Sequence, residues 1–107
     1  MEIEKEQILY RKNLKDLEEQ TAFFKALAHP SRLFIVKSLL KHEMCVHDIA
    51  EIIGVEMPTI SNHLKTLKNA GIIVREKRGS QAFYKIKYTC IVNLFECSRQ
   101  SMGEKRP

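Results

Sequence analysis

The chain has 107 residues, of which 44% are hydrophobic and 29% charged, a composition typical of one small soluble globular domain. Its charged start and the lack of an apolar run near the ~20 residues of a membrane span exclude a signal peptide and a transmembrane helix, so we expect a cytoplasmic protein. Three cysteines without paired spacing argue against a disulfide framework. The formal net charge is +5, but residues 57–87 hold seven Lys or Arg and one acid, a local net charge of +6. Such an excess indicates a phosphate-binding surface, unless the cluster is simply solvated.

The first predicted element is a long amphipathic helix over about residues 4–28, with a break near residue 20. Its inner side chains recur at helical spacing: Tyr10, Leu14, Leu17, Thr21 and Phe24. His29 precedes a proline and therefore ends this helix, and Pro30 can open the next one. The inner stripe of that second helix is Leu33, Val36, Leu39 and Leu40.

Two further helices follow, joined by a tight turn. The first is short, places Val46, Ile49, Ala50 and Ile53 inward and ends at Gly54. The second is PTISNHLKTLKNAG (58–71), in which Ile60, Leu64 and Leu67 form one apolar stripe. Its opposite face carries no acid, only Thr59, Asn62, Lys65, Thr66 and Asn69. The pair, over residues 46–70, predicts a helix-turn-helix, in which the second helix enters the major groove of DNA.

The pattern then changes to that of a β-hairpin. β-Branched residues at 72–74, a turn at Arg-Gly-Ser (78–80) and alternation over 82–87 predict a wing over residues 72–87. A last helix is predicted from about Tyr88 to Met102. A chain of this size with amphipathic helices at both ends has more apolar surface than one small core can cover, so we expect a dimer. The residues expected at the dimer contact are Leu14, Leu17, Ile91, Leu94 and Phe95.

The residue types on the second helix and the wing suggest roles in DNA binding. Thr59, Ser61, Asn62 and His63 lie in the first turns, where side chains reach base edges, and Asn62 is the expected reader because an amide can make a two-point contact to adenine. His63 contacts a base, holds a phosphate or packs beside the core. The expected phosphate contacts are Lys65, Thr66, Arg75, Lys77 and Arg78. Ser80 and Gln81 either enter the minor groove or form a plain solvent-facing turn.

Three stretches together resemble the ArsR/SmtB family of winged-helix repressors: FFKALAHPSRLFIVKSLL (23–40), EMCVHDIAEIIGVEMPTISNHLKTLKNAGII (43–73) and VREKRGSQAFYKI (74–86). The resemblance implies a homodimer, built mainly from the first and last helices, that binds an imperfect inverted repeat in double-stranded DNA and leaves it when an inducer binds. The predicted fold is mainly α-helical with a small β-hairpin. It is one winged helix-turn-helix domain over 1–107, with dimerisation helices at 1–28 and 88–102.

The cysteines are the candidate inducer site. Cys45 and His47 lie where metal-sensing relatives carry a Cys-x-Cys pair, but the further cysteines near the N-terminus of those relatives are absent, and so are the Asp and His residues with which other relatives bind zinc on the last helix. Cys90 and Cys97, seven residues apart, would share one face of the last helix and lie about 10.5 Å apart along its axis, too far for a mutual disulfide. Across an antiparallel dimer contact they could take arsenite or copper(I), or respond to oxidants or persulfides. The other interpretation is that all three cysteines are small packing residues and no cofactor binds.

A second class of function stays open on the sequence alone: a winged helix used for protein contact, or a thiol or metal-binding protein with incidental positive charge. The acid-free, amide-bearing helix face argues against both, because protein-contact surfaces favour aromatic and Met anchors. Enzymatic activity is not expected, since the sequence has no phosphate loop, no His-Glu-x-x-His run and no C-x-x-C.

Overall fold

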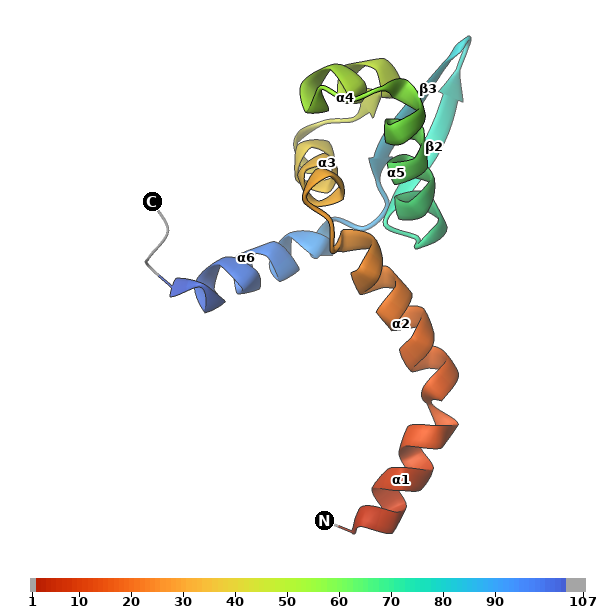
Figure 1. The fold of residues 1–107 in the computed structure, drawn as a ribbon, viewed down its shortest axis with the longest axis vertical. Coiled ribbons are helices and arrows are strands. Elements are labelled where there is room, and N and C mark those ends of the chain that lie inside the picture. The colour runs from red at the N-terminus through yellow and green to blue at the C-terminus, as the bar shows by residue number, and fades with distance from the viewer. Residues whose placement is uncertain (1, 104–107) are drawn as a thin grey trace.

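The computed structural model describes residues 2–103. The helices are α1 (Ile3–Lys12), α2 (Leu14–Leu27), α3 (Pro30–Lys41), α4 (Val46–Ile53), α5 (Met57–Asn69) and α6 (Val92–Ser101), with a 3-10 turn, η1 (Thr89–Ile91), before the last. The strands are β1 (Met44–Cys45), β2 (Ile73–Arg78) and β3 (Gln81–Ile86). In Figure 1, α3, α4, α5 and the sheet form a compact body, here called the head, while α1 and α2 extend from it as an arm and α6 leaves in another direction.

The N-terminal arm is divided earlier than expected. The break falls at Asn13, which links α1 to α2, and the predicted break near residue 20 is wrong. The Asn13 side-chain amide donates to the Leu9 carbonyl oxygen at 2.8 Å, which is the competition with backbone hydrogen bonding that makes asparagine a weak helix former. Thr21 bonds back to the Leu17 carbonyl in a similar way at 2.7 Å, but there the helix continues.

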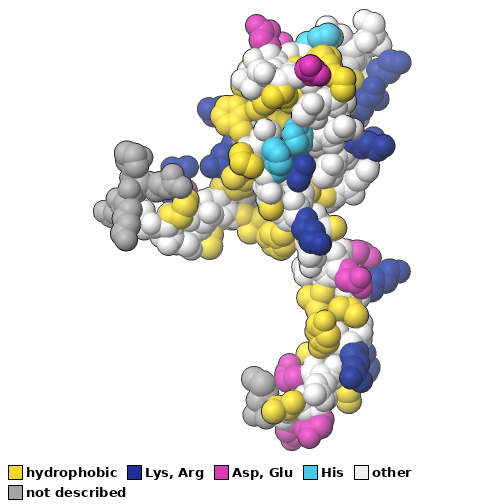
Figure 2. Space-filling view, in the orientation of Figure 1, with side chains coloured by type: hydrophobic (Ala, Val, Ile, Leu, Met, Phe, Trp, Pro, Cys, Tyr) yellow, Lys and Arg dark blue, Asp and Glu magenta, His cyan; other side chains and the backbone are white. Residues whose placement is uncertain are grey.

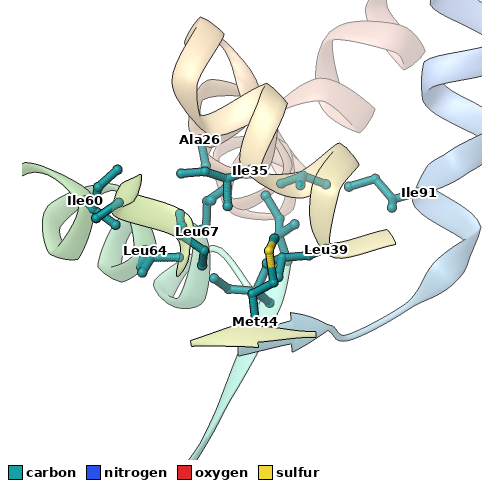
Figure 3. Close-up of a cluster of buried hydrophobic side chains, with 13 residues drawn as sticks. Ala26, Ile35, Leu39, Met44, Ile60, Leu64, Leu67 and Ile91 are labelled. Atoms are coloured by element: carbon teal, nitrogen blue, oxygen red, sulfur yellow. The ribbon is translucent and has the colours of Figure 1, made fainter. Parts of the chain in front are cut away.

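The core lies where α3 and α5 meet the sheet and the inner ends of the arm and η1. Figure 3 shows Ala26 from α2, Ile35 and Leu39 from α3, three residues of α5, Met44 from β1 and Ile91 from η1 converging on one cluster. Of the stripe predicted for α3, Val36 and Leu39 are buried and Leu33 and Leu40 half-buried, while the buried Ile35 was not in that stripe.

The predicted helix-turn-helix is confirmed in α4 and α5. Gly54 ends α4 in the left-handed conformation, with φ +79°, which glycine adopts at little cost. Pro58 lies in the first turn of α5, where a missing backbone N–H does no harm. The expected stripe Ile60, Leu64 and Leu67 is 0% exposed, so the opposite face of α5 points away from the core.

The wing is the antiparallel hairpin of β2 and β3, with its turn at Gly79 and Ser80 as the sequence predicts. A third strand joins it in the order β1-β3-β2, with Met44 opposite Tyr84 and Cys45 opposite Phe83. Strand β1 was not predicted from the sequence, because a two-residue strand has no periodicity and exists only through its pairing with β3.

The C-terminal segment is not one continuous α-helix. Residues 89–91 form the 3-10 turn η1, and α6 begins at Val92. Cys90 therefore lies outside the α-helix that carries Cys97, and the inference that seven-residue spacing puts both on one α-helical face is wrong. Ile91 is 5% exposed and belongs to the core of its own protomer.

The shape of the chain leaves apolar side chains uncovered. Its radius of gyration is 17.1 Å, against about 13 Å for a compact domain of about 100 residues. Figure 2 shows hydrophobic side chains at the surface of the arm. The exposed large apolar side chains of the arm are Ile3, Ile8, Leu9, Tyr10, Leu14, Leu17 and Phe24, and those of α6 include Val92 and Leu94. None of the helices within residues 2–103 is long and apolar enough to cross a membrane.

Candidate DNA interface

The outer face of α5 is a free polar surface. The predicted base and phosphate contacts Thr59, Ser61, Asn62, Lys65 and Thr66 are all exposed. Because the buried stripe holds α5 against the head, these side chains project from a rigid helix rather than from a loop. In the part of the chain that the structure describes, no side chain forms a hydrogen bond or ion pair with Asn62, so its amide is available to a ligand.

His63 differs from its neighbours on α5 because it is half-buried and already has a partner. Arg32 of α3 donates from Nη1 to His63 Nδ1 at 3.2 Å, and the His29 ring lies 4.6 Å from the His63 ring, centroid to centroid. Of the three interpretations left open for His63, packing against the head is the one that this geometry supports. Desolvation, with smaller electrostatic contributions from the nearby His29 and Arg32, lowers the pKa of His63, so its ring favours the neutral form.

The three predicted wing cations do not form one group. In the hairpin register, Arg75 pairs with Tyr84 and Lys77 with Ala82, on the face that continues from the core pair Ile73 and Ile86. Arg78 lies on the opposite face, among Glu76 and Phe83.

Arg78 is held by two carboxylates. Its Nη2 donates to Glu43 at 3.0 Å, with a second bond from Nη1, and its Nε donates to Glu76 at 3.1 Å. The guanidinium also lies 4.8 Å above the Phe83 ring. These contacts lower the pKa of both Glu43 and Glu76 and use most of the donors of Arg78. The predicted phosphate contact of Arg78 therefore competes with bonds inside the protein, whereas Arg75 and Lys77 have no ion pair within residues 2–103.

Cys45 and His47 lie next to this basic face. Together with Arg75, Lys77 and the tip residues Ser80 and Gln81 they line a small cavity of about 220 Å³ between α4 and the wing. Cys45 is 7% exposed and His47 is exposed. No cluster of three or more Cys, His, Asp or Glu able to hold a metal occurs within residues 2–103. Two neighbouring cations further disfavour a bound metal cation here and favour an anion.

The other two cysteines are exposed on the C-terminal segment, Cys90 in η1 and Cys97 on α6. Cys90 borders a mostly apolar cavity of about 350 Å³ lined also by Phe23, Ile72, Tyr88 and Leu94, between the arm and the C-terminal segment. Both thiols can therefore be reached from solvent in the protomer, unlike Cys45.

Arg32 and Glu43 were missed in the sequence analysis, although both contact predicted DNA-binding residues. Glu43 is an ordinary charged loop residue in the sequence. The one available indication for Arg32 was its position two residues after His29-Pro30, at the start of a helix whose first turn carries no acid to pair with it.

Comparison with known proteins agrees with this geometry. Residues 29–74 match the family model described as "Bacterial regulatory protein, arsR family". The chain is 42% identical over 82 residues to the cadmium resistance transcriptional regulatory protein CadC of Listeria innocua, covering 76% of this chain and 69% of that protein. It is 36% identical over 70 residues to the HTH-type transcriptional repressor SmtB of Mycobacterium tuberculosis, covering 65% of this chain and 52% of that protein.

Among solved structures, the homodimeric winged helix-turn-helix DNA-binding domain of a possible ArsR-family transcriptional regulator from Mycobacterium bovis is similar, with a TM-score of 0.78 at 27% identity. The similarity covers 89% of this chain and 88% of that chain. The winged helix-turn-helix arrangement of this chain thus occurs in a solved homodimeric DNA-binding domain. The chain belongs to the ArsR family of bacterial regulatory proteins, and it is a winged helix-turn-helix DNA-binding transcriptional repressor.

Proposed function

We propose that this repressor binds an inverted-repeat operator as a homodimer and reads each half-site with the outer face of α5. The main support for this proposal is the outer face of α5, which is exposed, free of acids and rich in amide and hydroxyl groups. It lies directly opposite a stripe that is fully buried. A helix fixed in this way can enter the major groove with its side chains already oriented. Because its partner is DNA, we expect the protein to act in the cytoplasm.

Within this surface the side chains divide by what they can contact. Asn62 is the proposed base reader, and Thr59 and Ser61 flank it in the first turns of α5. Lys65, Thr66, Arg75 and Lys77 are the proposed phosphate contacts, which position the protein without reading sequence. The exposed tip residues Ser80 and Gln81 extend the same edge of the wing toward the minor groove.

The dimer would form through the arm and α6. Leu14, Leu17 and Leu94 are exposed in the protomer and Phe95 is half-buried, so a partner subunit would cover apolar surface that solvent otherwise meets. Ile91 would support that surface from within the core rather than contact the partner. The similar domain from Mycobacterium bovis is homodimeric, which supports this assembly.

For the inducer, we propose a thiophilic species, such as arsenite, copper(I) or a persulfide donor, that acts on Cys90 and Cys97. Both thiols are exposed and lie on the C-terminal segment that the dimer would use, so a ligand there could change the geometry of the two α5 helices. The relative CadC is a cadmium resistance regulator, which supports a soft-metal or related signal in this branch of the family.

The test begins with selection of DNA by the wild-type protein from a randomised pool. We expect enrichment of a two-fold inverted repeat with half-sites about one helical turn apart. Asn62→Ala should then weaken binding to the selected duplex by about 1–3 kcal/mol and change binding to a scrambled duplex of the same length only a little. Gln7→Ala, at an exposed amide on α1 and outside the face of α5, is the control and should bind the selected duplex like wild type.

Two outcomes would contradict the proposal. If no sequence is enriched, α5 does not read DNA, and a protein-contact role for this winged helix becomes the better interpretation. If Asn62→Ala weakens binding to selected and scrambled duplexes equally, Asn62 contacts only the phosphate backbone.

A further inference from the structure

Two histidines and one arginine meet where α2, α3 and α5 come together. Arg32 Nε donates to the Ala26 carbonyl oxygen at 2.6 Å, at the end of α2, and its Nη1 donates to His63 Nδ1 at 3.2 Å, on α5. A longer contact of 3.5 Å joins Nη2 to the carbonyl oxygen of Lys25. One guanidinium therefore connects the end of the arm to the outer side of α5.

The hydrogen bonds determine which ring nitrogens carry protons. A guanidinium only donates, so His63 Nδ1 must accept and must be unprotonated. His29 Nδ1 likewise accepts from the backbone N–H of Ser31, where it caps the start of α3. The contact with Arg32 thus requires His63 to be neutral, with its proton on Nε2.

The surroundings favour that neutral state. The charged and titratable groups that act on His63 are His29 and Arg32, both from the start of α3, while α2 contributes carbonyl oxygens to Arg32. Positions three and four residues from His63 on α5 carry no charge. No carboxylate within residues 2–103 forms an ion pair with Arg32. Burial is the largest of the causes that lower the pKa of His63 below its ordinary value of 6.5.

We propose that Arg32 is a positioning residue, which ties α5 to the arm and holds it in its DNA-reading orientation only while His63 is neutral. This proposal rests on the role of α5 proposed above. Arg32 and His63 would thereby connect the arm, which forms part of the proposed dimer contact, to α5, which is proposed to read DNA. Neither side chain needs to touch a base.

The sign of the pH effect follows from the geometry. A proton on His63 Nδ1 would point at the guanidinium, so the hydrogen bond is lost and two cations face each other. Added positive charge near the DNA raises attraction to any duplex, while a loosened α5 reads sequence less well. The ratio of affinities for selected and scrambled DNA should therefore fall as the pH drops.

Protein stability should change with pH in the same direction. Because the folded pKa of His63 is lowered, the unfolded chain binds more protons as the pH falls below about 6.5. Stability is therefore highest above that pH and is lost as the pH falls through the folded pKa.

The test measures the ratio of affinities for selected and scrambled duplexes by fluorescence anisotropy at about pH 8 and at the lowest pH at which circular dichroism shows a folded chain, because the pKa of His63 lies below its ordinary value. For the wild type we expect the ratio to fall several-fold at the lower pH. Arg32→Gln and His63→Leu should lower the ratio about tenfold at about pH 8, the size of one charge-assisted hydrogen bond, and should remove the pH dependence. His63→Asn, whose amide oxygen can accept from Arg32 and does not titrate, should keep the ratio high at both pH values. His42→Asn, at an exposed histidine outside the cluster, should retain the wild-type profile.

A wild-type ratio for Arg32→Gln at about pH 8, or a wild-type pH dependence for His63→Asn, would overturn the proposal, since each variant removes one partner or its titration. If Arg32→Gln does not fold, as judged by circular dichroism, the two His63 variants decide the question alone. Failure of the proposed DNA reading gives a different result, because the wild type itself would then show no preference for the selected duplex, and the positioning role would fall with it.

Discussion

At the scale of single residues, the neighbouring wing cations Lys77 and Arg78 differ in what they can contact. Strand alternation places them on opposite faces of the hairpin. Arg78 meets Glu43, Glu76 and the ring of Phe83, while Lys77 lines the cavity beside α4 without an ion pair in the described chain. Counting basic residues in the sequence therefore overstates the positive charge that the wing offers to DNA.

This difference predicts separate effects on salt dependence. Lys77→Ala should weaken binding to selected and scrambled duplexes alike and reduce the slope of log affinity against log salt by about 1, because one phosphate contact is lost. Arg78→Ala should change that slope little, because its charge is already compensated by carboxylates. Titration of binding over a series of salt concentrations compares the two variants, and an equal change of slope would mean that Arg78 leaves its carboxylates on DNA.

At the scale of elements, the turn between α4 and α5 sets the angle of the helix-turn-helix. Gly54 supplies it with φ +79°, and a Cβ added there would meet no atom within 4 Å. Glycine is therefore required by the backbone conformation and not by a lack of space, since any L side chain is strained at this φ even where there is room for it. The backbone N–H of Gly54 also donates to the Ala50 carbonyl oxygen at 2.8 Å, which closes the last turn of α4.

Gly54→Ala should lower the free energy of unfolding by about 1 kcal/mol, the usual cost of a non-glycine residue in the left-handed region. Urea unfolding followed by circular dichroism measures it. Ala22→Gly, at a solvent-exposed position in the middle of α2, is the comparison. It should lower the free energy of unfolding by a similar amount, about 1 kcal/mol, and leave this turn intact. An unchanged midpoint for Gly54→Ala would show that the turn can adopt another conformation.

At the scale of the whole molecule, the arm and α6 extend away from the head, and the extents of the chain are 56 × 37 × 22 Å. A hollow on the arm has a mixed lining: Leu9, Tyr10, Leu17, Phe23 and Phe24 are apolar, and Glu6, Asn13, Asp16, Glu19 and Gln20 are polar or charged. The exposed apolar side chains among them form a surface that a monomer would be expected to cover. The protomer alone leaves this surface in water, and a second copy is the proposed cover.

Leu17→Asp should convert the dimer to a 12.5 kDa monomer, because a charge would be buried without a partner at the proposed contact. Val55→Asp is the matched control: Val55 is 41% exposed against 40% for Leu17 but lies in the turn before α5. Sedimentation at micromolar concentration measures both variants. If both variants remain dimers, the dimer contact lies away from Leu17. A monomeric wild-type protein would contradict the proposed assembly.

The inducer proposal is tested on the same assembly. Cys90→Ser and Cys97→Ser should leave operator affinity intact but abolish release by arsenite, copper(I) or a persulfide donor, because only the ligand side of the coupling is removed. Cys45→Ala, at the buried cysteine, should still be released. The measurement is release from the selected duplex against a panel of these compounds. Normal release of both C-terminal variants would identify these cysteines as packing residues.

Local patterns in the sequence were enough to predict the helix-turn-helix and the wing. The stripe Ile60, Leu64 and Leu67 and the stop at Gly54 act within one or two helical turns, and the hairpin is determined by a short turn with alternating residues on either side. The same patterns identified the exposed face of α5, because a helix that buries one stripe must expose the other. The break at Asn13 and the 3-10 turn at η1 were not predicted from these patterns, since competing local hydrogen bonds decide where a helix ends.

The tertiary structure alone decided which polar side chains are free and which are paired. Arg32 precedes His63 by 31 residues and Glu43 precedes Arg78 by 35, and strand β1 exists only because β3 lies beside it. Such partners depend on which side chains the folded chain brings within a few ångströms, and periodicity in one segment carries no information about that. The sequence by itself therefore determined the DNA-binding elements, while the fold determined that Asn62, Arg75 and Lys77 face outward unpaired and that His63 and Arg78 are held within the protein.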